Sequence, residues 1–408
     1  MSSGLSSTPE QAGHGAPFLS FSGVFNNYFV PEILEESMNT SVAEQKSHSV
    51  KKGDIFLTRT SETLDELAIS CVAFKDYPQA TFSGFVKRLR PISPDDVYPQ
   101  FIGFYLRNEL FRKTMSNNAV MTLRASFNEE IFSYLDLYLP DFDTQKKVGD
   151  LSYSIYSKIE LNNKRNKILY DLAKKIYTYW FIQFDYPDEN GKPYKTSGGG
   201  FEYNSVLKRE IPKGWKDGLI GNSSLSFSLG SGIEQFESEK IYLSTSEVNY
   251  TRIVKHENYI TLKSKPSRAN MQPVADSIWF AKMKNTRKNI LVSEFSEEII
   301  SDYIFSTGFA GIKTVNNSLY YLWNFICNDN FEKTKDLRSV GTTQKAVNSD
   351  FLSQLKILIP EQNILDKFHE IVKPIYEEIY INDRENLALS KLENWLVPML
   401  MNGQVKVK

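Results

Sequence analysis

Apolar residues recur in a seven-residue pattern along two long segments, one in the middle of the chain and one near its end. In the first segment, the residues that alternate between the two core positions of the repeat are Val148, Ser152, Ile155, Ile159, Asn162, Asn166, Leu169, Ala173, Ile176 and Trp180. The second segment places there Phe368, Val372, Ile375, Ile379, Asn382, Asn386, Leu389, Glu393, Leu396 and Leu400. This spacing predicts two helices, each about 60 Å long, that pack against each other as a coiled coil.

Two asparagines interrupt each apolar seam near its centre. In an antiparallel pair Asn162 faces Asn386 and Asn166 faces Asn382, so polar layers that cost stability fix the register. A parallel pair matches these layers equally well, and core composition does not decide between the two. Connectivity favours the antiparallel pair, because the first helix delivers the chain to its far end, from which the second can run back. The alternative is that the four asparagines are exposed helix positions.

Local signals set the ends of these helices. The alternating run from 135 to 139 predicts a strand, after which Pro140 opens the first helix. In the second helix, Pro374 is expected to kink or delay the helix and Pro398 to end it, because proline lacks an amide hydrogen and clashes with the preceding turn.

The helices belong to a longer repeat. Leu139-Pro140 returns as Ile359-Pro360 at an offset of 220 residues (360 − 140), and the offset holds without a gap on both sides. Asn108 and Phe111, for example, meet Asn328 and Phe331. Further upstream the match loosens to fragments such as Gly84-Phe85 against Gly308-Phe309 and residues 53–56 against 275–279. Two copies of such a long period indicate a duplicated domain and not a solenoid.

The repeat predicts an α+β protein in which two α/β domains are separated by two long helices packed as an antiparallel coiled coil. The expected divisions are a first domain at 1–140, a first helix at 141–184, a linker at 185–214, a second domain at 215–359 and a second helix at 360–403. Turn-forming residues dominate 185–200 and predict no regular element there.

Composition fits a soluble globular protein, with 41% hydrophobic and 24% charged residues in 408. The first residues resemble no leader sequence and no segment has the length of a membrane span, so we expect a cytoplasmic protein without a membrane partner. A net charge of −1 argues against a free-standing tight DNA binder but permits local basic patches. Cys71 and Cys327 are expected to be buried apolar residues rather than a disulfide or zinc ligands.

Catalytic signatures are missing from the sequence. Gly191-Lys192 is followed by Pro193, so it is no phosphate-binding loop, and the glycines at 198–200 follow no predicted strand. The four histidines lack metal-ligand spacing. No Asn-Pro-Pro-Tyr or Asp-Pro-Pro-Tyr run of the kind used by amino-methyltransferases occurs. We therefore predict no catalytic, metal or cofactor site in this chain.

The chain resembles the specificity subunit of type I restriction-modification systems. The resemblance covers the whole chain and rests on the order of domains and helices and on several stretches. These are Lys208-Arg-Glu-Ile-Pro-Lys-Gly-Trp215, Leu396-Val-Pro-Met-Leu-Met-Asn-Gly-Gln404, Gly53-Asp-Ile-Phe-Leu-Thr-Arg-Thr-Ser-Glu62, Gly84-Phe-Val-Lys-Arg-Leu-Arg-Pro91, and residues 158–164, 172–181 and 184–194.

The resemblance implies a function. In that family two target-recognition domains each read one half of a split, asymmetric double-stranded DNA site, and antiparallel conserved helices hold them apart as a ruler for the unread base pairs. The same helices dock two modification (methyltransferase) subunits that bring S-adenosylmethionine. Restriction subunits, which are ATP-dependent translocases and nucleases, add ATP and magnesium. No cofactor is then expected on this chain.

One departure from the family pattern concerns the first domain. Glu10-Gln11 and Leu19-Ser20 match Glu234-Gln235 and Leu243-Ser244 at an offset of 224, so Met1 corresponds to position 225. Residues 215–224 then have no counterpart in the first domain. The start site is misplaced or the first domain has lost an edge strand.

Reading bases requires Arg, Lys, Asn, Gln, Ser or Thr on loops that reach a groove, whereas phosphate contacts need positive charge and amide donors. The candidates in the first domain are Arg59, Thr60, Lys87, Arg88 and Arg90. The candidates in the second domain are Arg268, Asn270, Lys282, Lys284, Asn285, Arg287 and Lys288. The alternative for any one of these residues is an ordinary solvated side chain.

Three functions compete. The first is a DNA-recognition subunit without catalysis of its own, and the second is a fused restriction-methylation enzyme, which would need the motifs that are missing. The third is a coiled-coil scaffold that binds only protein, for which the basic loops are incidental.

Overall fold

The structure is a computed structural model that describes residues 1–6, 8–61, 66–118, 125–126, 136–341, 345–348 and 350–407. The chain divides into two compact units, each built from helices and sheets. Unit 1 comprises Met1–Asn163 with Asp383–Lys408, and unit 2 comprises Lys164–Asn382. The predicted fold class is confirmed.

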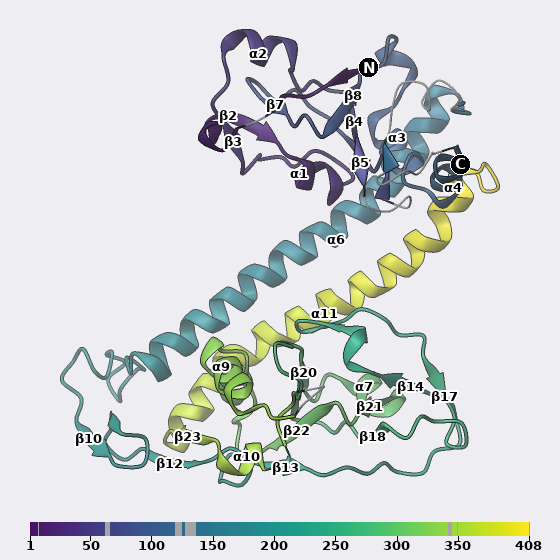
Figure 1. Ribbon diagram of the computed structural model, residues 1–408. Coiled ribbons are helices and arrows are strands. Elements are labelled where there is room, and N and C mark those ends of the chain that lie inside the picture. Colours follow the sequence, from purple (N-terminus) through teal and green to yellow (C-terminus); the bar gives the residue numbers. More distant parts are fainter. Residues whose placement is uncertain are drawn as a thin grey trace. The chain divides into compact units, whose positions relative to one another are not determined.

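The described residues of unit 1 form three sheets. The largest is antiparallel, in the order β1 (Ser2–Ser3), β8 (Val86–Leu89), β4 (Ile55–Thr58), β6 (Ser70–Val72), and Figure 1 labels β8 and β4. A second has the order β3 (Ser37–Met38), β2 (Ala12–Leu19), β7 (Thr81–Phe82), and β5 (Thr60–Ser61) pairs with β9 (Ala125–Ser126). The short helices are α1 (Phe21–Phe25), α2 (Val42–Ser47), α3 (Pro99–Tyr105) and α4 (Glu109–Asn118).

In the part of unit 2 that the structure describes, two sheets have four strands each. One has the order β13 (Ser226–Leu229), β22 (Phe309–Thr314), β19 (Ser277–Ala281), β20 (Asn289–Val292), and the other the order β17 (Tyr259–Ile260), β14 (Lys240–Leu243), β21 (Tyr303–Ser306), β18 (Ala269–Met271). Three pairs complete it: β10 (Phe201–Asn204) with β11 (Arg209–Pro212), β12 (Lys216–Leu219) with β23 (Lys356–Ile359), and β15 (Val248–Asn249) with β16 (Arg252–Ile253). Its short helices are α7 (Glu297–Asp302), α8 (Leu319–Ile326), α9 (Asp329–Arg338) and α10 (Phe351–Gln354).

The main sheets of the two units repeat one topology. The order β1-β8-β4-β6 matches β13-β22-β19-β20, and the parallel pair of β2 with β7 matches that of β14 with β21. The strands β4 and β19 are buried along their whole length, because alternate side chains enter different cores. In β4, Ile55 and Leu57 pack with Phe101, whereas Phe56 packs with Phe82. This two-sided burial explains the near-continuous apolar sequence of both strands.

The strand expected at 135–139 is not found, since residues 136–139 have no regular structure and residue 135 lies outside the described residues. The repeat explains the difference. Its counterpart β23 is a strand because it pairs with β12, which lies within 215–224. Among the described residues, no strand pairs with 136–139 in the way that β12 pairs with β23. An alternating pattern alone does not make a strand without one.

The segment at 185–214 is more ordered than a plain linker. It contains the hairpin of β10 and β11, and Phe184, Tyr186 and Ile211 are buried in the core of unit 2. The stacked rings of Tyr186 and Trp215, with centroids 5.1 Å apart, fix this segment to the start of the second domain.

The two long helices are α6 (Phe142–Tyr177), which continues into a π-helical turn at Thr178–Ile182, and α11 (Gln362–Met401). α11 runs through Pro374 and Pro398, so Pro374 does not delay the helix and Pro398 does not end it. That Pro374 kinks the helix stays a prediction. Burial of the neighbouring Val372 and Tyr376 in the core of unit 2 offsets the hydrogen bond lost at Pro374. Pro398 lies in the last turn, where few further helix bonds depend on it.

Within each unit, α6 and α11 pack antiparallel. In unit 1, Asn162 Nδ2 donates to Asn386 Oδ1 at 3.0 Å, and Lys158 lies 3.0 Å from the Glu385 carboxylate. In unit 2, Asn382 Nδ2 donates to Asn166 Oδ1 at 2.9 Å. Tyr170 contacts Tyr376, and Trp180 contacts Phe368. Residue numbers therefore increase along the first helix as they decrease along α11, which is the antiparallel arrangement. Asn162, Asn166 and Asn382 are buried rather than exposed.

Candidate nucleic-acid interface

A tight turn between β21 and β22 organises the basic residues of unit 2. The turn consists of Thr307 and Gly308, and the Gly308 amide donates to the Ser306 hydroxyl at 3.1 Å. A Cβ atom on Gly308 would lie 3.2 Å from a methyl carbon of Thr245 and 3.7 Å from the guanidinium of Arg268. Glycine at this position therefore lets the side chains of two other loops close around the turn.

Backbone hydrogen bonds hold two cations at this turn, and a side-chain bond holds a third on the neighbouring loop. The Thr307 amide donates to the Arg268 carbonyl at 2.8 Å, and the Lys282 amide donates to the Gly308 carbonyl at 2.9 Å. Lys288 Nζ donates to the Thr245 carbonyl at 2.7 Å. We call Arg268, Lys282, Lys288 and Thr307 the unit 2 turn cluster. The sequence predicted its three cations as DNA contacts, and the fold brings them together.

The charges within the unit 2 turn cluster repel one another. Burial lowers the pKa of Lys282, and the positive charge of Arg268 lowers it further. Holding like charges together in a partly buried place is unfavourable unless an anion joins them. A phosphate group would relieve this repulsion and favour the charged form of Lys282.

The other predicted residues of unit 2 lie on neighbouring loops. Lys284 and Asn285 are exposed after β19, where their amides donate to the Lys345 carbonyl at 2.8 Å and to the Asp336 carboxylate at 2.9 Å. Asn285 has φ 55°, a left-handed conformation that asparagine tolerates. Asn270 lies within β18 and is half-buried.

Arg287 is held by protein groups. Its guanidinium lies 2.7 Å from the Asp329 carboxylate and donates to the Cys327 carbonyl. The same contact lowers the pKa of Asp329. The basic run at 282–289 therefore divides, because Lys282 and Lys288 surround the turn while Arg287 lies at the junction of α8 and α9.

Unit 1 has the same turn between β7 and β8. The Arg59 amide donates to the Phe85 carbonyl at 2.8 Å, as the Lys282 amide does to Gly308 in unit 2. Phe85 is exposed on this turn, and Lys87 lies in β8 opposite Ser3. We call Arg59, Phe85 and Lys87 the unit 1 turn cluster. The side chain of Thr60, also predicted, lies outside the described residues.

The side chains of Arg88 and Arg90 bind other groups of unit 1. Arg90 forms a two-pronged ion pair with the buried Asp54, at 2.6 Å from Nε to Oδ1 and 2.7 Å from Nη2 to Oδ2. Arg88 donates to the Ser49 carbonyl at 2.6 Å and lies over the ring of Phe82. Their guanidinium groups stabilise the sheet, which a list of basic residues could not reveal.

Sequence reasoning missed the turn residues Phe85 and Thr307. The repeat match of Gly84-Phe85 with Gly308-Phe309 pointed to both turns. It pairs Phe85 with Phe309, which begins β22, and so it could not identify Thr307. Within the described residues, no group of three or more His, Cys, Asp or Glu side chains could hold a metal ion, and no helix is both long and apolar enough to cross a bilayer.

Comparison with known proteins gives a coherent result. Residues 6–170 match a family model described as the type I restriction modification DNA specificity domain. The chain is 26% identical over 378 residues to the type I restriction enzyme MjaIX specificity subunit of Methanocaldococcus jannaschii, covering 88% of this chain and 78% of that protein. It is 21% identical over 449 residues to the HindI specificity subunit of Haemophilus influenzae, covering 95% of this chain and 94% of that protein.

A crystal structure of the S subunit of a type I restriction-modification system from M. genitalium has the same fold. The TM-score is 0.58 at 11% sequence identity, over 98% of this chain and 92% of that one.

Proposed function

The chain is related to the specificity subunits of type I restriction-modification systems, and we propose that it recognises a DNA sequence for such a system without a catalytic site of its own. The observation that carries the proposal is the recurrence of one basic turn in both units. Arg59 in unit 1 and Lys282 in unit 2 donate the same backbone bond to the same turn. Two copies of one DNA-reading element suit a site made of two half-sites.

We assign the unit 1 and unit 2 turn clusters to the DNA, with Lys284, Asn285 and Asn270 as further contacts of unit 2. Cations and amide donors near the turns would bind phosphates, and Thr307 and Asn270 have the polar groups that read base edges. The side chains of Arg88 and Arg90 are bound by other groups of unit 1, and Arg287 supports the α8–α9 junction. We therefore withdraw these three arginines from the candidate DNA contacts.

The long helices are the proposed docking surface for two modification subunits. On α6, Leu161, Ile168 and Leu172 are exposed apolar residues at positions that share one face. The repeat places Ile381 and Leu392 of α11, also exposed, at the positions of Leu161 and Leu172. Two equivalent apolar stripes suit two copies of one partner, which would bring S-adenosylmethionine. ATP and magnesium would come with restriction subunits.

The direct test measures binding of duplex DNA by the complex of this chain with its modification subunits. The double variant Arg268→Ala with Lys282→Ala should weaken binding and flatten its salt dependence by about one unit of slope per lost phosphate contact. Lys216→Ala, which removes an exposed charge from β12, is the matched control and should change neither. Equal binding by the double variant and the control would contradict the assignment.

The helices should also set the distance between half-sites. Inserting four residues at equivalent points of α6 and α11 adds about 6 Å to each helix. The methylated motif should then have a longer unread spacer and unchanged half-sites. Undiminished methylation at the original spacing would refute this role.

A further inference from the structure

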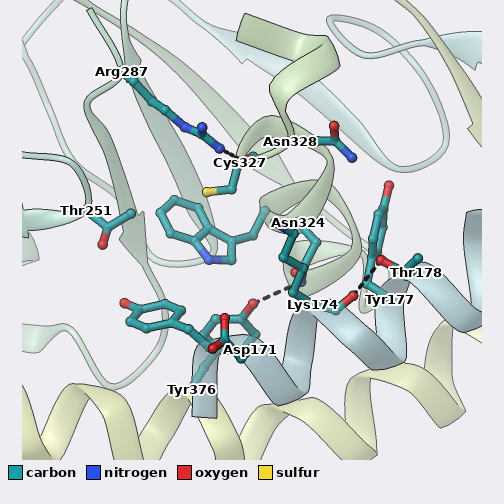
Figure 2. A pocket seen from close by; sticks show the side chains of 12 residues that line it. Asp171, Lys174, Tyr177, Thr178, Thr251, Arg287, Asn324, Cys327, Asn328 and Tyr376 are labelled. Atoms are coloured by element: carbon teal, nitrogen blue, oxygen red, sulfur yellow. Dashed lines mark hydrogen bonds between the residues drawn. The ribbon is translucent and has the colours of Figure 1, made fainter. Parts of the chain in front are cut away.

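A cavity of about 220 Å³ lies in unit 2 between α6 and the junction of α8 with α9. Figure 2 shows Arg287, Tyr177 and Tyr376 among the side chains that line it. The rings of Tyr177, Tyr376 and Trp323 are buried, so they form part of its wall and cannot reach the edge of a base. Unit 1, in contrast, presents an exposed ring beside Arg59, one of the predicted DNA contacts.

This exposed ring belongs to Phe85, at the tip of the turn between β7 and β8. Phe85 is 64% exposed, while the next residue, Val86, is buried. The Phe85 amide donates to the Ser83 hydroxyl at 3.3 Å, and the Arg59 amide donates to the Phe85 carbonyl at 2.8 Å. The backbone of Phe85 is therefore held on both sides while its ring meets solvent.

Hydrogen bonds identify Gly308 as the equivalent residue of unit 2. The Gly308 amide donates to the Ser306 hydroxyl at 3.1 Å, and the Gly308 carbonyl accepts from the Lys282 amide at 2.9 Å. These are the same two bonds that hold Phe85 in unit 1. The two turns therefore share a backbone arrangement and differ in the side chain at the tip.

The surroundings of the two tips also differ. In unit 2, a Cβ atom on Gly308 would lie 3.2 Å from a methyl carbon of Thr245 and 3.7 Å from the guanidinium of Arg268, so the neighbouring loops leave no room for a ring. In unit 1 the tip is open enough to leave Phe85 exposed. Unit 1 thus offers DNA an apolar group at the place where unit 2 offers cations.

Two cations lie next to the Phe85 ring. Arg59 is exposed, and its amide is bonded to the Phe85 carbonyl. Lys87 lies two residues after Phe85, and alternate residues of an extended segment share one face. Because β4 and β8 pair antiparallel, Arg59 and Phe85 stand at one end of a two-stranded ribbon, a shape that the major groove of DNA is wide enough to admit.

We propose that the Phe85 ring reads a thymine in the half-site of unit 1, by packing against its 5-methyl group in the major groove. The proposal rests on the proposed function, in which the unit 1 turn cluster binds DNA. Base edges in the major groove present hydrogen-bond donors and acceptors, and the thymine methyl is the apolar group among them. A ring without polar atoms gains by contact with that methyl group and not with the other groups.

Insertion of the ring between base pairs is the competing arrangement. Insertion has to unstack the bases, and it is favourable where apolar side chains cover the opened step. Phe85 has no such help from its neighbours in the chain, because Gly84 has no side chain and Val86 is buried. Contact with a base edge needs only the one ring that the turn presents.

The test measures the affinity of the complex of this chain with its modification subunits for a duplex that carries the motif the complex methylates. Each thymine is replaced in turn by uracil, which lacks the methyl group and keeps the same hydrogen-bonding edges. One replacement in the unit 1 half should weaken wild-type binding by about fourfold, the effect of one buried methyl group.

Phe85 variants connect this effect to the ring. Phe85→Ala should bind the thymine and uracil duplexes equally at that position, whereas Phe85→Leu, which keeps an apolar side chain, should retain part of the difference. The matched control is Ile92→Ala, which removes another exposed apolar side chain of unit 1 and should leave every thymine-to-uracil difference unchanged.

Three results would overturn the reading of thymine by Phe85 and leave the proposed function standing. They are a unit 1 half-site without thymine on either strand, sequence-specific binding that is the same for all uracil duplexes, and a thymine-to-uracil difference that persists in full in Phe85→Ala. An absence of sequence-specific binding by the wild-type complex would contradict the proposed function, and this inference with it.

Discussion

Units 1 and 2 share a sheet topology and differ in how they fill it. Unit 1 closes its interior with Tyr28, Phe104 and Arg107, whereas unit 2 leaves a cavity at the same place. Unit 2 adds the pair of β12 and β23, whereas the matching residues of unit 1 form no strand. The difference teaches that the repeated apolar pattern determines the framework, while individual side chains determine what each unit can bind.

A shared ion pair shows the same principle on a smaller scale. Asp54 and Arg90 form a short two-pronged pair in unit 1, and Asp276 and Lys313 occupy the matching places 3.8 Å apart in unit 2. The geometry of arginine permits two parallel bonds that lysine cannot make. The same position thus stabilises both units to different degrees.

The largest effect on this comparison is expected from Arg107→Ala. The Arg107 guanidinium donates to the carbonyls of Ser70 and Asn27, each at 2.7 Å, and its loss leaves these oxygens unsatisfied. The free energy of unfolding of unit 1 should fall by about 3 kcal/mol. Hydrogen exchange resolved along the chain should show faster exchange in unit 1 only. The matched control is Cys327→Ala in unit 2, and equal effects of both changes would show that Arg107 does not hold unit 1.

The next effect concerns DNA. Arg59→Ala should change only the half-site read by unit 1, and Lys282→Ala only the half-site read by unit 2. If the side chain reads a base, the binding free energy should fall by about 1–3 kcal/mol for sites that carry that base. If the side chain binds a phosphate, binding should weaken equally for all sequences. Binding to a panel of DNA sites with single changes in either half separates these outcomes. If both variants lost binding to the same set of DNA sites, the assignment of one half-site to each unit would be contradicted.

A third change sharpens the comparison of the polar layers. Replacing Asn162 and Asn386 together by Leu should raise the thermal stability of unit 1 by about 1 kcal/mol while loosening the register of the helices. Glu385 keeps its ion pair with Lys158, so no new buried charge results. The equivalent change at Asn166 and Asn382 tests unit 2. A double-mutant cycle should find coupling between Asn162 and Asn386, and coupling with Asn382 instead would contradict the antiparallel register.

The smallest effect is expected from Glu393, where burial raises the pKa of the carboxyl group. Because its pKa in the folded state lies above that in the unfolded state, its contribution to stability is largest below the unfolded pKa. The contribution is lost as the pH rises through the folded pKa. Glu393→Gln should therefore stabilise unit 1 at neutral pH, by about 1 kcal/mol at most, and this gain should vanish in acid. Thermal unfolding at both pH values measures it, and a gain that is larger in acid would contradict the sign.

The sequence alone predicted much of the framework. Heptad spacing located both long helices and placed Asn162 and Asn386 in their seams, because a core position depends only on local periodicity. Connectivity, and not the core composition, selected the antiparallel pairing of these two asparagines. The strand at 135–139 was predicted wrongly, since a strand needs a partner and the sequence around it does not say whether one exists. The helix runs through both prolines, because tertiary packing offsets the local cost of Pro374 and Pro398 lies in the last turn.

The candidate site was harder to predict. Arg59 and Arg90 look alike in the sequence, yet the Arg90 side chain is occupied by the buried Asp54. Which arginine meets a carboxylate inside the protein depends on sheet pairing that composition does not encode. The cavity was also beyond the sequence, because it depends on Asn324 and Cys327 taking the places that the larger Phe104 and Arg107 fill in unit 1.

The most direct measurement of the central claim is selection of bound sites from random duplex DNA by the complex of this chain with its modification subunits. The account predicts one motif of two specified halves separated by unspecified base pairs. With Arg268→Ala and Lys282→Ala together, the half read by unit 2 should lose definition while the other half is retained. A single uninterrupted motif, or loss of both halves in that variant, would contradict the claim that each unit reads its own half.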